Sequence, residues 1–489
     1  MQITVADLAY LLPLLLTAAL AVVLMLVIAT RRNHTITCAA TIFGMAIAIL
    51  ATLWLGSGVD ARVTPLLIVD GIGWFFTLLV LVVSAFVAVF SYHYLLRLKD
   101  QVEEFYLLLV IATIGAIVMV SSDHFISAFL GMETLSIALY AMVAYPLHSK
   151  QAAKFPLEAG IKYLVLSAVA SAMFLFGVAL LYAYTGSLAF SSAAGIGAAA
   201  DFGEQAYLGL AVSLILAGMA FKLSLAPFHI WTPDVYEGAP LPATVFLATT
   251  GKAAMFVLML RFIATSGALA LPVVVLVLSI LAALSMIVGN VLALRQENLK
   301  RLLAYSSIAH MGYLLVAVIT VDGTAASLGG ETVGFYLVAY VVMSLGAFGV
   351  SLAVSGSNRE FDFVSDYEGL FWREPWLATL LTTMLLSLAG IPLTAGFIGK
   401  FYVVLAGVQG SLWVLLMLLV IGSGIGIYYY LRVVYRMVLP VTGKSEFRVA
   451  GWASIGTYTV LGFLLFMVLA LGIYPSLLMD LLQTLFIGF

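Results

Sequence analysis

The sequence is 489 residues long, and its composition is typical of a membrane protein. Hydrophobic residues make up 64% of it and charged residues 9%, whereas soluble domains average about 45–50% apolar and about 25% charged residues. The formal net charge of −2 gives no reason to expect nucleic acid as a partner. The single cysteine, Cys38, excludes an internal disulfide and any cysteine-ligated zinc or iron–sulfur site.

Apolar runs long enough to cross a bilayer recur along the whole chain. A helix crosses the hydrocarbon layer of ~30 Å with about 20 apolar residues, so we predict an all-α integral membrane protein with about fourteen spans. The twelfth run is too long for one straight helix and contains Gly390, Pro392 and Gly396, so we predict that it is broken. The predicted spans are residues 9–30, 36–55, 72–96, 105–121, 124–146, 159–184, 206–227, 243–261, 271–293, 302–320, 331–354, 375–407, 411–431 and 452–476.

The distribution of basic residues predicts the orientation, because cytoplasmic connections are enriched in lysine and arginine. Alternate connections hold sixteen of the twenty-one Lys and Arg residues, and the opposite set holds only Arg62 and Arg261. With fourteen spans, both termini are expected on the non-cytoplasmic side. The sixteen residues are Arg31, Arg32, Arg97, Lys99, Lys150, Lys154, Lys162, Arg295, Lys300, Arg301, Arg359, Arg373, Arg432, Arg436, Lys444 and Arg448.

Four charged residues fall inside the predicted spans: Glu133, Lys222, Lys252 and Lys400. Lys252 is nine residues from each end of its span, roughly 13 Å at about 1.5 Å per residue. A lysine side chain does not reach water over that distance. Glu133 has a shorter side chain and is similarly deep, and Lys400 is the only charged residue between Glu374 and Arg432.

These charges have two interpretations. A charge at the centre of a span costs about 2.5–3.5 kcal/mol on insertion scales and usually marks an ion or proton path. In the alternative, the charges are paired inside the bundle and only hold helices together. Lys222 has a further alternative, because Pro227 could mark the membrane boundary and leave the ammonium within reach of water. The three deeper charges favour a shared polar axis that includes Lys222.

Two further residues are candidates for proton transfer. His310 is ten residues past the basic end of its span, near the midplane, where a histidine could relay protons between its neutral and charged forms. It could equally be a hydrogen-bonded core residue. Lys162 lies nearer the cytoplasmic end and could serve as an entrance, although an ordinary lysine reaching toward water explains it equally well.

Helix-breaking residues adjoin two of the lysines. Pro227 and Pro233 follow Lys222, and Pro392 precedes Lys400. The backbone groups that a proline frees at membrane depth must meet protein or water, so we expect these breaks to line hydrated cavities.

The seventh and twelfth spans are five apart, and a duplicated unit of five spans has opposite orientation in the membrane, as in secondary transporters. We therefore predict two inverted repeats, helices 4–8 and helices 9–13, with broken helices 7 and 12. On this mapping Lys222 corresponds to Lys400 and Glu133 to His310. The predicted segments are a three-helix segment 1–104, the repeats 105–263 and 264–440, and a C-terminal helix in 441–489.

Three motifs carry a family resemblance: "FKLSLAPFHIWTPDVYEGAP", "NLKRLLAYSSIAHMGYLL" and "SLAGIPLTAGFIGKFY". They resemble the antiporter-like membrane subunits of NADH-quinone oxidoreductase, respiratory complex I, which have counterparts in mitochondrial NADH dehydrogenase. The resemblance covers essentially the whole chain, and the three motifs together are very specific. Some members of the family carry glutamate on the twelfth helix, and Lys400 resembles those that carry lysine.

The resemblance implies residue roles. Glu133 on helix five, Lys222 on helix seven, Lys252 on helix eight and Lys400 on helix twelve would form the central proton-transfer axis. In the family the helix-five glutamate pairs with the helix-seven lysine, and the helix-eight lysine bridges to helix twelve. His310 and Lys162 are accessory positions.

The resemblance also implies a setting. The chain would be a subunit of a proton-translocating NADH:quinone oxidoreductase of the respiratory chain in the bacterial inner membrane, with no redox centre of its own. FMN, iron–sulfur clusters, NADH and quinone would bind to other subunits. The expected partners are an antiporter-like M-type subunit on one side, the small subunits A, J and K on the other, and the lipid bilayer.

Two other functions remain open. A subunit of a multi-subunit sodium/proton antiporter shares this fold and lysine axis and would show sodium-dependent proton flux. A scaffold whose buried charges only fix helix packing would lose assembly, and not pumping, when Lys222 and Lys252 are replaced.

Overall fold

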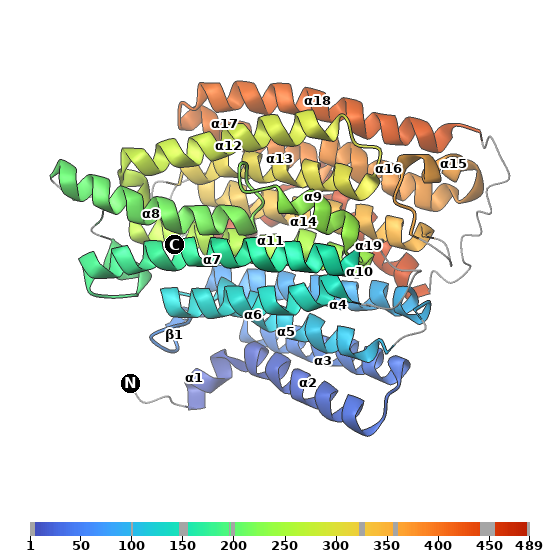
Figure 1. The fold of residues 1–489 in the computed structure, drawn as a ribbon, viewed down its shortest axis with the longest axis horizontal. Helices are drawn as coiled ribbons and strands as arrows, with labels where there is room; N and C mark the ends of the chain where they lie inside the picture. The colour runs from blue at the N-terminus through green and yellow to red at the C-terminus, as the bar shows by residue number, and fades with distance from the viewer. Residues whose placement is uncertain are drawn as a thin grey trace.

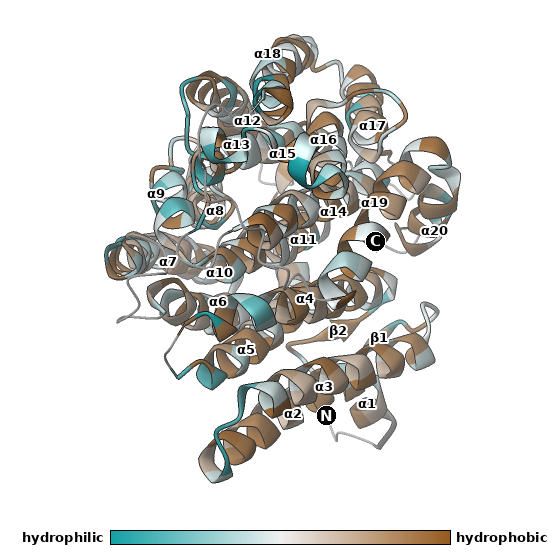
Figure 2. Ribbon diagram, turned by 90° about the vertical axis from the view of Figure 1, so that its right-hand side faces the viewer, coloured by the Kyte–Doolittle hydropathy of each residue, from teal (hydrophilic) through white to brown (hydrophobic). Residues whose placement is uncertain are grey.

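The computed structural model describes residues 5–98, 101–145, 155–194, 196, 201–321, 328–355, 360–440 and 455–486. Lys99, Lys150, Lys154, Arg359, Lys444 and Arg448, which the orientation argument uses, lie outside these residues. Within the described part, the sheet structure is limited to one antiparallel hairpin of β1 (Ala61–Arg62) and β2 (Ile68–Val69). The helices run roughly parallel, with α2 and α3 at one edge of the bundle and α18 at the opposite edge (Figures 1 and 2).

The prediction of about fourteen spans is confirmed. Thirteen helical segments of the described residues are long and apolar enough to cross a membrane, and the pair α16 and α17 adds a broken fourteenth. Figure 2 shows hydrophobic colour along the helices and hydrophilic colour mainly near their ends. The helices up to α9 are α1 (Val5–Tyr10), α2 (Leu12–Thr30), α3 (His34–Leu55), α4 (Gly71–Leu96), α5 (Glu103–Val120), α6 (Phe125–Ala144), α7 (Pro156–Thr185), η1 (Phe190–Ala193), α8 (Phe202–Lys222) and α9 (Trp231–Gly238). The remaining helices are α10 (Leu241–Phe246), η3 (Leu247–Gly251), α11 (Lys252–Ser266), η4 (Ala268–Ala270), α12 (Pro272–Ala293), α13 (Leu299–Ile319), α14 (Leu328–Val354), η5 (Val364–Tyr367), α15 (Leu370–Arg373), α16 (Pro375–Ala389), α17 (Ala395–Gln409), α18 (Trp413–Val438), α19 (Ile455–Ile473) and α20 (Ser476–Phe486).

The helices of the two five-helix repeats pack against one another in the same sequence. Each repeat opens with a pair of helices in close contact, α5 with α6 and α12 with α13, and then packs α7 on α8 and α14 on α16 and α17. Glycine permits both close pairs, as is common in membrane bundles. A Cβ on Gly115 would lie 2.5 Å from the backbone nitrogen of Leu135, and a Cβ on Gly289 would lie 2.6 Å from that of Ala309.

Both predicted helix breaks are present. α8 ends at Lys222, residues 223–230 form no regular helix, and α9 follows. Pro227 therefore lies in the break between α8 and α9. In the twelfth span α16 ends at Ala389 and α17 begins at Ala395. The backbone turns through positive φ at Ser224 (64°), Gly390 (86°) and Leu393 (69°).

The eighth span is continuous but irregular. It runs from Leu241 to Ser266, and its middle is a π-helical stretch, η3, that ends immediately before Lys252. π-Helical turns inside α-helices are frequent at functional sites, because they leave backbone groups without their usual helical partners.

The structure differs from the sequence prediction at two basic residues. Lys300, predicted in a connection, is buried in the first turn of α13. Arg261, predicted at the opposite surface, is buried within α11, and its Nη1 and Nη2 lie 2.6 Å and 2.9 Å from the two carboxylate oxygens of Asp70. Burial raises the pKa of Asp70, but the Arg261 guanidinium and the Gly73 amide reverse that effect and lower it overall. A basic residue near a helix end can therefore be buried inside the protein when it has an acidic partner there.

Candidate proton-transfer site

The structure brings Glu133 and Lys222 together. Glu133 projects from the middle of α6, and Lys222 is the last residue of α8, directly before the break. The Lys222 Nζ lies 3.9 Å from Glu133 Oε1, with 4% of the lysine side chain and 24% of the glutamate side chain exposed. The two charges form an ion pair whose atoms are slightly too far apart for a hydrogen bond.

Hydroxyl groups complete the surroundings of this pair. Lys222 Nζ donates to Ser136 Oγ at 2.6 Å and to Ser167 Oγ at 2.5 Å. Ser171 Oγ donates to Glu133 Oε1 at 2.5 Å, and the Tyr140 hydroxyl donates to Ser167 at 2.6 Å. Lysine and glutamate thus each keep a neutral hydrogen-bond partner besides one another, so the ion pair can open without leaving either group without a hydrogen bond.

Lys252 lies in a separate polar cluster. Only 1% of the residue is exposed, and its Nζ donates to Ser307 on α13. Ser307 Oγ lies 2.7 Å from the Tyr340 hydroxyl, which also donates to the backbone oxygen of Ala248 at 3.1 Å. Ala248 belongs to η3, so the tyrosine partners a carbonyl in the π-helical stretch. The Lys252 ammonium also lies 5.8 Å from the centre of the Tyr236 ring, within range of a cation–π contact.

His310 is buried among tyrosines. Its Nδ1 lies 2.7 Å from the Tyr336 hydroxyl and its Nε2 lies 3.4 Å from the Tyr430 hydroxyl. Its ring centre lies 5.7 Å from that of Tyr340 and 5.6 Å from that of Tyr313. Both ring nitrogens therefore face hydroxyl groups, which can donate or accept a proton.

Lys400 is held by the other half of its own broken span. Its Nζ donates to the backbone oxygens of Leu388 at 3.0 Å and Ala389 at 2.9 Å, the last carbonyls of α16. The ammonium also lies 5.3 Å from the centre of the Tyr313 ring. The carboxyl end of a helix carries partial negative charge, so it stabilises a cation there.

Tyrosines connect the second half of the predicted axis. Tyr340 contacts both the hydrogen-bond partner of Lys252 and the His310 ring, and Tyr313 contacts both the His310 ring and the Lys400 ammonium. Lys222 and Lys252 have different hydrogen-bond partners, and no direct bond joins them among the residues that the structure describes.

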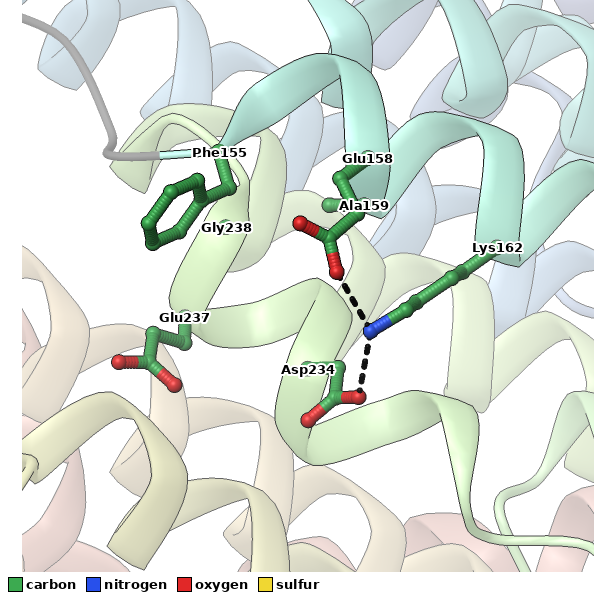
Figure 3. Close-up of a pocket in the computed structure, with 7 residues that line it drawn as sticks. All are labelled: Phe155, Glu158, Ala159, Lys162, Asp234, Glu237 and Gly238. Atoms are coloured by element: carbon green, nitrogen blue, oxygen red, sulfur yellow. Dashed lines mark hydrogen bonds and ion pairs between the residues drawn. The ribbon is translucent and has the colours of Figure 1, made fainter.

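Lys162 lies apart from these groups, near the amino end of α7, with 44% of its side chain exposed. Figure 3 shows its ammonium between Glu158, at 2.7 Å, and Asp234, at 3.1 Å, beside a pocket of about 100 Å³. Asp234 also binds Arg301 at 2.7 Å. Partial burial raises the pKa of Asp234, but hydrogen bonds from Arg301 and Lys162 outweigh it and lower the pKa overall.

The sequence analysis did not identify the hydroxyl groups of the site. Ser136 and Tyr140 lie three and seven residues after Glu133, and Ser167 and Ser171 are four apart. These spacings place each set on one face of a helix, which is the signal that could have found them. Among the described residues, no three His, Cys, Asp or Glu side chains are grouped so as to hold a metal ion.

Fold and site together define a class: a multi-span membrane protein with two repeats, two broken helices and a line of buried lysines. Residues 122–426 match the model of the transmembrane domain of the NADH:quinone oxidoreductase/Mrp antiporter family. The chain belongs to this family.

Two relatives are called NADH-quinone oxidoreductase subunit N. The one from Methylococcus capsulatus is 48% identical over 98% of this chain and 95% of its own length, and that from Ectopseudomonas mendocina is 44% identical over 98% and 97%. Within the family, the sequence motifs most closely resemble this subunit.

Two solved structures are also similar. A chain of respiratory complex I from Thermus thermophilus is 33% identical with a TM-score of 0.81, over 96% of this chain and 98% of its own. A chain of the Mrp complex from Dietzia sp. has a TM-score of 0.85 over 98% and 97% at 18% identity, and so shows the shared fold alone.

Proposed function

We propose that this chain is a proton-translocating membrane subunit of a bacterial NADH-quinone oxidoreductase and therefore part of a translocase. The observation that carries the proposal is the Glu133–Lys222 pair, a buried ammonium 3.9 Å from a carboxylate at a helix break. The subunit N relatives, at 44% and 48% identity over nearly the whole chain, support the same assignment. Buried ionisable residues of this kind usually serve ion or proton paths.

The pair supplies a switch. When it is closed, the Glu133 carboxylate favours the protonated form of Lys222; when it is open, burial favours the neutral amine. Ser171 remains bonded to the carboxylate in the open state, while Ser136 and Ser167 remain near the lysine nitrogen. Opening therefore turns Lys222 from a proton acceptor into a proton donor. A charge change arriving from the neighbouring subunit would drive the opening.

Onward transfer would use the second half of the axis. The proton released by Lys222 would pass to Lys252, then by way of Tyr340 and His310 to Lys400, which lies at the second break. Water admitted by the breaks would connect Lys222 to Lys252, since broken helices at membrane depth line wet cavities. Lys162 would be an accessory surface group at the entrance, with a minor part in transfer.

The assembled enzyme would supply the energy from quinone reduction. FMN, iron–sulfur clusters, NADH and quinone would bind in other subunits. An M-type antiporter-like subunit would lie on one side of this chain and the small subunits A, J and K on the other. In the bacterial inner membrane, both termini would face away from the cytoplasm, and the segments 1–104, 105–263, 264–440 and 441–489 would form the structural units.

Replacing Lys222 by methionine, or Glu133 by glutamine, tests the proposal. We expect the rate of NADH-driven proton pumping per assembled complex in inverted membrane vesicles to fall by about 10²–10⁴-fold, the range for loss of a proton-transfer group. Arg436→Met is the matched control, because it removes a charge from an exposed ion pair with Glu368. Unchanged pumping by Lys222→Met while electron transfer continues would refute the proposal. Pumping that requires sodium would favour the antiporter function, and loss of assembly alone would favour a scaffold.

A further inference from the structure

Another buried ion pair lies at the junction between α9 and the eighth span, and the proposed transfer path does not include it. Lys300, in the first turn of α13, binds Glu360 and lies 3.4 Å from Asp362. The side chains of Lys300 and Glu360 are 3% and 4% exposed. Such burial makes each charge dependent on the other.

The Lys300 ammonium binds the carboxyl end of α9. It donates to the backbone oxygens of Glu237 at 3.3 Å and Ala239 at 3.2 Å. These carbonyls lie at the end of the helix, where no further turn supplies their hydrogen bonds and where the helix dipole favours a cation. Lys300 therefore caps α9, the helix that follows the first break.

The Glu360 carboxylate binds the start of the eighth span. Its Oε1 accepts a hydrogen bond from the Leu241 amide at 3.2 Å, at the beginning of the segment Leu241–Ser266. The amino end of a helix favours an anion. One ion pair thus bridges the negative end of α9 and the positive end of the next helix, and both charges are aligned with the helix dipoles.

The helix that carries Lys300 also carries the partner of Lys252. Ser307 follows Lys300 by seven residues, about two turns, and so lies on the same face of α13. Ser307 accepts the hydrogen bond from the Lys252 ammonium. Because α13 binds the end of α9 through Lys300 and the eighth span through Ser307, the position of the α9 end relative to α13 bears on how Lys252 meets Ser307.

We propose that Lys300 and Glu360 are positioning residues that hold Lys252 against Ser307 by fixing the junction between α9 and α10. This inference rests on the proposed function, since it assigns the pair to proton transfer through Lys252. Neither residue transfers the proton in this scheme.

Lys300→Met in the whole complex tests the inference. Misplacing Lys252 should lower the pumping rate per assembled complex by between about 10-fold and 100-fold, the cost of a displacement near 1 Å. The KM for NADH should not change, because NADH binds elsewhere. Lys300→Arg keeps a cation that can cap α9 and should restore pumping to within about threefold of the wild type. Wild-type pumping by Lys300→Met, or no recovery with Lys300→Arg, would overturn the inference.

Two further variants distinguish a positioning role of Lys300 and Glu360 from a role in folding alone. They also distinguish failure of this inference from failure of the proposed function. Lys300→Met with Glu360→Gln and Asp362→Asn removes all three charges of the cluster, so the complex should assemble, yet pumping should stay slow. Full recovery of pumping, or failure to assemble, would show that the pair serves only folding and would overturn the inference. Lys252→Met is the functional reference. Normal pumping by Lys252→Met would contradict the proposed function. Loss of pumping in Lys252→Met, with normal pumping in the Lys300 variants, would contradict only the positioning role.

Discussion

The two broken spans hold their lysines in different ways. Lys222 is the last residue before the first break, whereas Lys400 is the sixth residue of the helix that follows the second break. Lys222 faces a carboxylate 3.9 Å away and two serine hydroxyls. Lys400 faces the carbonyl end of α16, and among the described residues it has no carboxylate within 4.0 Å.

This difference separates two means of stabilising a buried cation. An ionisable partner such as Glu133 can move away and change the charge balance at Lys222. The end of a helix is a fixed dipole, so its contribution to the field at Lys400 changes only if the break itself moves. The two breaks therefore resemble each other in backbone but not in the surroundings of the lysine. Under the proposed function, this difference would make the first break a switch and the second a fixed relay.

The largest expected difference between the two breaks is in the stability of the complex when the lysine is removed. Lys400→Met leaves two buried carbonyl oxygens without a donor, and each such loss costs about 1–3 kcal/mol. Lys222→Met with Glu133→Gln removes both charges of the first ion pair, and its serines keep other partners, such as the bond from Tyr140 to Ser167. We expect Lys400→Met to lower the thermal midpoint of the purified complex more than this double variant does. Equal shifts would show that the two environments are energetically equivalent.

A smaller difference in stability is expected from substitutions in the turns of the two breaks. Gly390 has φ 86°, and a Cβ there would lie 2.9 Å from Lys400 Cδ. Gly390→Ala should therefore destabilise the complex by about 1–2 kcal/mol, the cost of left-handed backbone for an L-residue, and displace the ammonium as well. Ser224, in the first break, already adopts φ 64°, so Ser224→Gly should be neutral or stabilise by up to about 1 kcal/mol. Thermal unfolding of both variants measures the contrast, and destabilisation by Ser224→Gly would contradict it.

The sequence predicted the spans, both breaks and the burial of Lys222, Lys252 and Lys400, because hydropathy and proline act locally. A run of about 20 apolar residues identifies a span wherever it packs. The pairing of Glu133 with Lys222 came from the family resemblance, since nothing local relates α6 to α8. The ion pair agrees with it, while the functional roles of the lysines, His310 and Lys162 remain predictions.

Other features depend on packing that no local pattern encodes. The capping of α16 by Lys400 requires the geometry of the break, and the pairing of Lys300 with Glu360 joins residues sixty apart. Lys300 stands in a basic cluster beside Arg301, and such a cluster normally indicates a solvated connection. The burial of Lys300 results from its contacts with Glu360 and the end of α9, which only the folded structure shows.

The smallest effect is expected at Lys162. Its side chain is 44% exposed, so Lys162→Met should cost only about 0.2–1 kcal/mol of stability and change pumping by less than about twofold. The pKa of its partner Asp234 is lowered, so the stabilising contribution of that carboxylate is present above its unfolded pKa of about 4 and is lost as the pH falls through the lower folded value. Between about pH 5 and pH 8 the carboxylate stays ionised in both folded and unfolded chains. The pH profiles of pumping by the wild type and by Lys162→Met should therefore coincide over this range, and a divergence would place Lys162 on the transfer path beside Lys222.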